Sequence, residues 1–233
     1  MKNMGLAKLY LVNPPDFESG DARKMATGSG DVLYGATVSD SLQSALSGTV
    51  LSVATTHRRR QHFEQPSSPQ EAARKLTSLP PDAEGALVLG REDSGLTNEE
   101  LHLCSLVARI PTAQQYPSLN LAQAALIFAY ELSRAAAAGP ETRRQDLASF
   151  EQVESLYEHI ASALDKLGFV SSQRPETFMH SIRRTFGRMA LERAEIVTLH
   201  KIFRQVDKFV ARTGFQNEQN SNSVTATNKK RTP

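Results

Sequence analysis

Two strand–turn–helix stretches in the middle of the chain constrain its fold more than any other feature of the sequence. They span residues 86–100 and 107–125, and each begins with a short apolar run. The run at 86–89 is continuous rather than alternating, which is typical of a parallel strand covered on both faces. Thr97 and Glu100 have the spacing of a capping box, so a helix is expected to follow at once. The sequence therefore predicts an α/β fold whose parallel strands bring polar residues to one edge of the sheet, where such folds bind ligands.

Apolar runs and capping patterns predict two further strands and four further helices in this part of the chain. The strands are expected at 6–12 and 49–54, and the helices at 16–26, 41–46, 69–78 and 121–138. Ser68 gives the clearest helix start, because Pro69 stands at the first helical position and Glu71 completes a capping box. Asp40 is the expected N-cap of the helix at 41–46.

Composition favours a globular intracellular protein. Cys104 is the only cysteine in 233 residues, which excludes an internal disulfide and suits the reducing cytoplasm. No apolar run approaches the roughly 18 residues of a membrane helix, and no secretory signal is visible. No histidine has partners at zinc-ligand spacing, so no metal is expected, and His102 and Cys104 are interpreted as packing residues.

The composition changes after residue 138. Residues 139–146 are a charged linker, and apolar residues then recur every three or four positions, which predicts three amphipathic helices. We therefore divide the chain into a domain at 1–138, the linker, a helical domain at 147–212 and a disordered tail at 213–233.

Two arginine clusters are candidates for contacts with phosphate groups, although the formal net charge of the chain is only +2. One follows the strand at 49–54 and the other lies on the second helix of the helical domain. The residues are Arg58, Arg59 and Arg60, and Arg183, Arg184 and Arg188. A solvated loop and a solvated helix face without any partner are the alternatives.

Residues 90–98, 110–111 and 118–121 resemble motifs two and three of the SpoU-type RNA 2′-O-ribose methyltransferases of the knotted SPOUT class. The matching residues are Gly-Arg-Glu-Asp-Ser-Gly-Leu-Thr-Asn, Ile-Pro and Ser-Leu-Asn-Leu. The resemblance runs from Met1 to about Phe209. It implies a SPOUT-type parallel sheet with a C-terminal trefoil knot, S-adenosyl-L-methionine as the cofactor, tRNA as the substrate, a homodimer and no metal. It also implies that the helical domain at 147–212 is a tRNA-binding extension.

The resemblance also assigns roles to individual residues. Ser118 and Asn120 are implied to be catalytic, and their alternatives are a turn residue and a helix N-cap. Glu92 is implied to orient the motif-two turn or a partner's arginine, and a surface charge is the alternative. Backbone groups at strand ends are implied to hold the cofactor. The positions are Thr55, Thr56, His57, Gly90, Ile110, Pro117, Ser118 and Leu119.

Motif one of this family, which carries an asparagine and an arginine that act at the ribose, has no counterpart here. Gly5 is typical of the residue that ends a helix, yet only four residues precede it. We therefore expect the first strand to be missing because the chain starts late, with a naturally short variant as the alternative.

Two functions compete on these grounds. The first is 2′-O-methylation of a cytidine or uridine at position 32 of the tRNA anticodon loop. The second is a catalytically impaired protein that binds tRNA or dimerises, because motif one is absent. A Rossmann-like nucleotide binder is a distant third, since no Gly-x-Gly-x-x-Gly follows a strand. The apolar stripe of the helix at 121–138 fits either a dimer interface or an intramolecular core; its residues are Leu121, Ala125, Phe128 and Leu132.

Overall fold

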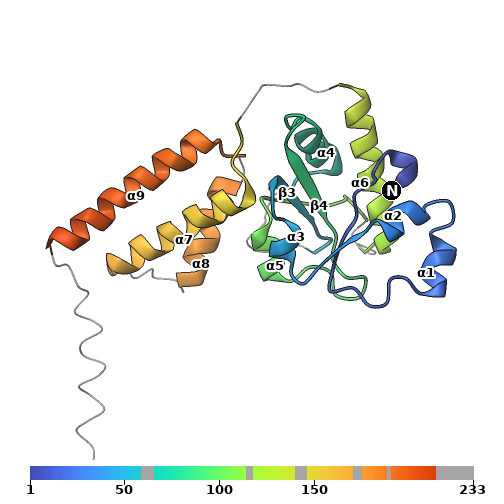
Figure 1. The fold of residues 1–233 in the computed structure, drawn as a ribbon, viewed down its shortest axis with the longest axis horizontal. Coiled ribbons are helices and arrows are strands. Elements are labelled where there is room, and N and C mark those ends of the chain that lie inside the picture. Colours follow the sequence, from blue (N-terminus) through green and yellow to red (C-terminus); the bar gives the residue numbers. More distant parts are fainter. Residues whose placement is uncertain (59–65, 114–117, 140–145, 170–174, 188–189, 214–233) are drawn as a thin grey trace, which may run out of the picture.

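The computed structural model describes residues 1–58, 66–113, 118–139, 146–169, 175–187 and 190–213. It contains an α/β unit, which is formed by the described residues up to 139, and a helical unit, which is formed by those from 146 onward (Figure 1). All strand pairs between the named strands are parallel, so the predicted fold class is confirmed.

Strand β3 (Thr49–Thr55) is the centre of a three-stranded sheet. It lies between β4 (Glu84–Val88) and β5 (Leu106–Ala108). Val53 and Ala54 of β3 are both fully buried, and they belong to hydrophobic clusters on opposite faces of the sheet. Both faces of this central strand are therefore covered, as is typical of a parallel sheet with helices on each side.

A second, separate parallel pair consists of β1 (Tyr10–Val12) and β2 (Thr37–Ser39). The strand expected at 6–12 is thus shorter than predicted. β2 has no counterpart among the predicted strands, because its three residues are too few to give a periodic pattern. At the N-terminus, Gly5 ends the 3₁₀ turn η1 (Lys2–Met4) in the left-handed conformation expected of it, at φ 75°.

The short helices of the N-terminal part depart most from expectation. The helix predicted at 16–26 is reduced to α1 (Gly20–Met25), and α2 (Gly30–Tyr34) lies in a stretch for which no helix was predicted. Ser41, not Asp40, caps α3 (Leu42–Ala45). The Ser41 hydroxyl accepts a hydrogen bond from the third amide of that helix at 3.1 Å, which is the usual geometry of an N-cap.

Longer helices cover both faces of the three-stranded sheet. On one face α4 (Pro69–Thr77) packs against α6 (Leu121–Ala137), and Phe128 of α6 contacts the cluster around Val53. On the other face, α3 and α5 (Asn98–Leu103) pack around Ala54. The capping boxes predicted at the starts of α4 and α5 are both present, so these two helices begin where expected.

The helical unit consists of α7 (Phe150–Lys166), α8 (Pro175–Gly187) and α9 (Arg193–Thr213). Its core is apolar. The buried members are Ala148, Leu156, Tyr157, Ile160, Leu191 and Ile196. A polar network also joins α7 to α9: His159 hydrogen-bonds His200 at 2.7 Å and Asp207 at 2.9 Å.

The two units touch along the start of α7 and the end of α8. Phe150 is buried in the cluster formed by α3 and α5, and the rings of His102 and His180 stack at 3.6 Å. A Cβ added at Gly187 would lie 2.7 Å from the carbonyl oxygen of Ser105, so α8 approaches the α/β backbone closely. The helical unit is therefore held against the α/β unit by packing as well as by the chain connection.

Glu151 contributes a polar clasp to this interface. Its carboxylate accepts hydrogen bonds from the Ser47 hydroxyl at 2.5 Å and from the Gly48 amide at 2.9 Å. The bond from Ser47, assisted by one from Ser149, lowers the pKa of Glu151 to about 2. The unfolded chain binds this proton near pH 4.5, so the clasp stabilises the fold fully above that pH and is lost as pH falls toward 2.

We expect Glu151→Gln to lower the free energy of unfolding by about 1 kcal/mol at pH 7, the usual worth of a hydrogen bond to a partly solvated group. The deficit should shrink as pH falls below 4.5, which urea titrations at pH 7 and at pH 3.5 would measure. Glu158→Gln is the matched control, because Glu158 is exposed on the same helix and has no described partner. An equal loss in both variants would contradict the clasp.

Several predictions fall wholly or partly outside the described residues. They concern most of the linker at 139–146, the tail at 213–233, and Arg59, Arg60, Pro117 and Arg188. The trefoil knot and the homodimer stay predictions, and so do the domain boundaries.

Candidate functional site

The carboxyl ends of β3, β4 and β5 open into one cavity of about 220 Å³. This is the edge at which parallel sheets commonly bind ligands. The cavity brings together the described residues that were predicted from three separate parts of the sequence. These are Thr55, Thr56, His57, Arg58, Gly90, Ile110, Ser118 and Leu119. Asn120 stands beside them, since its amide bonds Glu92, which also lines the cavity.

The end of β3 forms the first wall of this cavity. The Thr55 hydroxyl donates to the carbonyl of Val88 on β4 at 3.1 Å, and the Thr56 amide donates to Ala108 of β5 at 3.1 Å. The Thr56 hydroxyl in turn accepts from the Arg58 amide at 3.2 Å. The Thr55 side chain and the Thr56 backbone therefore hold the strand ends together, whereas the Thr56 side chain holds the start of the loop that follows β3.

The loop at 90–95 forms the second wall. Arg91 and Gly95 exchange backbone hydrogen bonds of 3.3 and 2.9 Å, and Gly95 has a φ of +72°. Gly90 lies against this returning segment so closely that an added Cβ would be 2.3 Å from the Gly95 carbonyl carbon. Only glycine therefore fits at position 90.

Arg91 also supports this loop, a role that no pattern in the sequence indicates. Its guanidinium donates two hydrogen bonds to the Glu100 carboxylate, at 3.0 and 2.9 Å. Arg91 is the largest cause of the lowered pKa of Glu100, which also closes the capping box of α5 with Thr97. The loop is thus tied to the first turn of the helix that follows it.

Asn120 joins the motif-two loop to the start of α6. Its Oδ1 accepts from the Ala122 amide at 2.8 Å, which makes it the N-cap of α6, and its Nδ2 donates to Glu92 Oε1 at 3.2 Å. The N-cap role weighed from the sequence is therefore present. Because Glu92 lines the cavity, the same side chain also orients a carboxylate at the cavity wall.

The arginines predicted to contact RNA differ in their surroundings. Arg58 is exposed and lines the cavity. Arg183 instead forms a two-point ion pair with Glu154, with Nη2–Oε2 at 2.7 Å, and stacks over the Tyr157 ring at 4.5 Å. It is engaged within the helical unit, whereas Arg184 beside it is exposed.

Among the described residues, no group of three histidine, cysteine, aspartate or glutamate side chains is placed to hold a metal ion. In the same ranges, no helix has the length and apolarity needed to cross a membrane. The walls of the cavity offer hydroxyl, amide and backbone groups to a ligand.

Comparison with known proteins identifies the α/β unit. The model of the SpoU rRNA methylase family matches residues 1–130, more than half of the chain. The chain belongs to the SpoU methylase family. The model of the TrmJ tRNA methyltransferase C-terminal domain matches residues 151–219, so the C-terminal part of this SpoU methylase is similar to that of TrmJ. The resemblance found in the sequence is thus confirmed.

Named relatives agree with this assignment. The tRNA (cytidine/uridine/adenosine-2′-O-)-methyltransferase TrmJ of Pseudomonas aeruginosa is 38% identical over 221 residues, which are 89% of this chain and 86% of the relative. The tRNA (cytidine/uridine-2′-O-)-methyltransferase TrmJ of Pectobacterium atrosepticum is 38% identical over 213 residues, 89% of this chain and 88% of the relative.

Solved structures of similar chains support the fold. The crystal structure of TrmJ from Z. mobilis ZM4 has a TM-score of 0.73 at 30% identity and covers 89% of this chain and 90% of its own. A probable methylase family protein from Haemophilus influenzae has a TM-score of 0.55 at 29% identity, with coverage of 91% and 89%. This SpoU methylase is therefore an enzyme of the methyltransferase class with a SPOUT-type fold.

Proposed function

We propose that this enzyme transfers a methyl group from S-adenosyl-L-methionine to a ribose 2′-hydroxyl of tRNA. The observation that carries the proposal is the cavity at the ends of β3, β4 and β5, which gathers the residues of motifs two and three. The names of the relatives supply the substrate class, because both are tRNA 2′-O-methyltransferases.

The cavity walls fit the proposed cofactor. The backbone groups of Gly90, Ile110 and Leu119 make no hydrogen bond to any described residue, although all three positions are partly buried. Partly buried backbone groups normally have partners, so these three are available to a ligand with donors and acceptors of its own. Glycine at position 90 also lets the returning segment of the loop lie close enough to keep this cavity wall in place. When bound, S-adenosylmethionine supplies an electrophilic methyl group.

The protein's part in the reaction is to position the ribose and to accommodate one proton. Ser118 is exposed at the cavity, and Asn120 lies at the start of α6 with its amide toward Glu92. We assign the ribose-facing roles to Ser118 and Asn120. Arg58 is assigned to an RNA phosphate near the cavity, because it is exposed at the end of β3.

The finer proposals concern the target nucleotide and the assembly. Position 32 of the anticodon loop is proposed from the resemblance, with cytidine or uridine as the base. A homodimer is supported by Leu126 and Tyr130, which are 55% and 49% exposed on α6, whereas Phe128 of the predicted interface stripe is buried within the monomer. An exposed apolar pair of this kind is suited to a second copy.

A methyl-transfer assay tests the proposal. The full chain is incubated with radiolabelled S-adenosylmethionine and an unmodified tRNA transcript that carries cytidine at position 32. We expect label in the tRNA, and nucleoside mass spectrometry should find it as 2′-O-methylcytidine. The control is the same tRNA with a 2′-deoxyribose at position 32, which removes the attacking hydroxyl.

The outcomes separate the competing functions. Label in both tRNAs would keep the reaction but reject position 32. Binding of tRNA without any transfer would favour the impaired tRNA-binding protein that the sequence left open. A transcript that is neither bound nor methylated would overturn the proposed substrate.

A further inference from the structure

The outer face of α9 carries a row of basic side chains that has no role in the site described above. Lys201, Arg204, Lys208 and Arg212 are all exposed, and their spacings of three and four residues place them on one face of the helix. We call these four residues the α9 stripe. It extends over roughly 16 Å at the usual rise of an α-helix, which is long enough to meet several phosphates.

The charge of the α9 stripe is not neutralised inside the protein. None of the four side chains forms an ion pair with another described residue. The two acidic residues of α9 are engaged elsewhere: Asp207 pairs with Lys166 at 2.7 Å on the side facing α7, and Glu195 accepts from the amide of Glu192 at 2.8 Å in the first turn. The stripe is therefore a local positive surface on a chain of nearly balanced charge.

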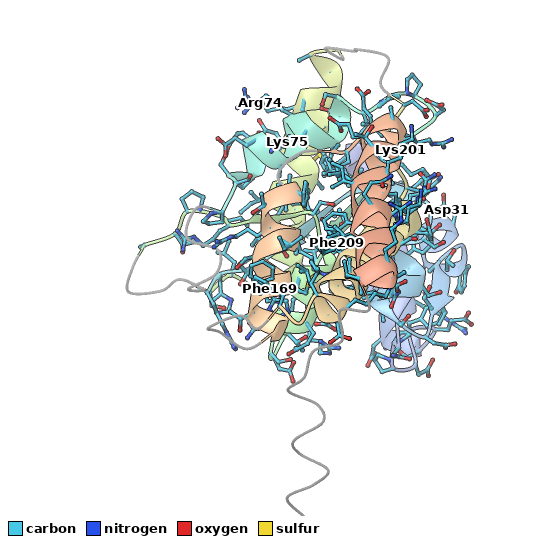
Figure 2. The ribbon with its side chains drawn as sticks, turned by 90° about the vertical axis from the view of Figure 1, so that its left-hand side faces the viewer. Asp31, Arg74, Lys75, Phe169, Lys201 and Phe209 are labelled. Atoms are coloured by element: carbon cyan, nitrogen blue, oxygen red, sulfur yellow. The ribbon has the colours of Figure 1, made fainter. Side chains whose placement is uncertain are left out.

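The position of α9 leaves this face open. The helix packs on α7 through partly buried Leu199 and Phe203, and it lies at the outer edge of the helical unit in Figure 1. In Figure 2, Lys201 and Phe209 mark α9 on the side that faces the viewer. The apolar residues of α9 that face α7 are thus covered, and the outer face presents the four basic side chains together with the exposed Ile202 and Phe209.

We infer that the α9 stripe binds the sugar–phosphate backbone of the RNA substrate, an inference that rests on the proposed tRNA substrate. Clustered lysines and arginines on one helix face attract phosphates in a way that does not depend on sequence. The engagement of Arg183 with Glu154 favours α9 over α8 as the RNA-facing helix of this unit. An anionic membrane is the competing occupant, because Ile202 and Phe209 are 53% and 57% exposed beside the stripe.

Salt dependence of binding tests this inference directly. The stripe variant replaces all four residues by glutamine, which is a good helix former and so keeps α9 intact. Its matched control replaces Arg23, Lys24, Arg74 and Lys75 by glutamine in the same way. These four residues are exposed on α1 and α4 and carry the same total charge as the stripe. Arg74 and Lys75 are labelled on α4 in Figure 2. Affinity for an unmodified tRNA transcript is measured for wild type and both variants between 50 and 200 mM salt.

We expect the stripe variant to lose about three to four from the slope of log affinity against log salt, because each lost phosphate contact removes roughly 0.7 to 0.9. The ratio of wild-type to stripe-variant affinity for tRNA should therefore be largest at 50 mM salt. It should fall by roughly 50- to 150-fold between 50 and 200 mM salt. The control variant should keep the wild-type slope. KM for tRNA should rise in the stripe variant while kcat stays within about twofold, since a phosphate contact far from the ribose binds ground and transition states equally.

Each other outcome has a fixed meaning. Equal slopes in the two variants, while wild type binds and methylates tRNA, would overturn the stripe and leave the proposed function standing. If the stripe variant lost the binding to vesicles of anionic phospholipid that wild type shows, and bound tRNA as wild type does, the stripe would be assigned to a membrane instead. A wild-type protein that neither binds nor methylates tRNA would overturn the proposed function itself.

Discussion

Replacing Gly90 by alanine is expected to remove most of the methyl-transfer activity while leaving the protein folded. The added Cβ would lie 2.3 Å from the carbonyl carbon of Gly95 and 2.4 Å from the amide nitrogen of Leu96. Both are backbone atoms of a segment tied to Gly90's own loop by the hydrogen bonds between Arg91 and Gly95. The loop must therefore move as a whole, and it forms one wall of the cavity.

Overpacking of this kind costs about 1–3 kcal/mol, which a domain of ordinary stability survives. We expect cofactor affinity to fall by at least about tenfold, since a loss of 1.4 kcal/mol in binding corresponds to that factor. Methyl transfer should fall by roughly 100-fold or more, because displacements near 1 Å are enough to disturb a reacting geometry to that extent. Calorimetry with S-adenosylmethionine and the tRNA assay would measure the two effects.

Gly20→Ala is the matched control. Gly20 is the first residue of α1, and a Cβ there would meet no other atom within 4 Å. Its cofactor affinity and activity should equal those of wild type. If Gly90→Ala bound the cofactor as tightly as Gly20→Ala does, the loop at 90–95 would not be a wall of the cofactor site.

The parts of the fold that could be predicted are those in which a signal lies within a few residues of the structure it specifies. The capping boxes at Ser68 and Thr97 are hydrogen bonds between positions three apart, and both helices begin where they predict. The run at 49–54 predicts a central strand because four of its six residues are apolar; its two polar residues, Thr49 and Ser52, are buried with hydrogen-bond partners inside the chain. The position of the cavity could likewise be predicted from the paired motifs, because the carboxyl ends of parallel strands meet at one edge of the sheet.

The contacts that could not be predicted join residues distant in the chain. Arg183 stands with other arginines in the sequence, and only the folded helical unit shows that Glu154 and Tyr157 receive it. Arg91 depends on the same kind of contact with Glu100. The α9 stripe is periodic and visible in the sequence, but only the packing of α9 on α7 shows that Asp207 pairs with Lys166 and leaves the stripe without an acidic partner among the described residues.

Asn120 offers the sharpest test of the catalytic proposal, because its structural and chemical roles can be separated. As the N-cap of α6 it needs only a side-chain oxygen, which accepts the Ala122 amide at 2.8 Å. As a ribose-facing residue it needs its Nδ2 donor, which lies 3.2 Å from Glu92. Serine supplies the first and not the second, because its shorter hydroxyl is used by the cap.

We therefore expect Asn120→Ser to keep the thermal stability of wild type and to lose roughly 100- to 1,000-fold in kcat, the usual effect of removing one preorganised donor at a reacting centre. Asn120→Ala should show the same loss of kcat together with about 1 kcal/mol of stability, because the cap is also gone. Single-turnover methyl transfer and urea unfolding of the same preparations would measure both quantities. An Asn120→Ser enzyme with wild-type turnover would reduce Asn120 to a helix cap and leave Ser118 as the residue at the ribose.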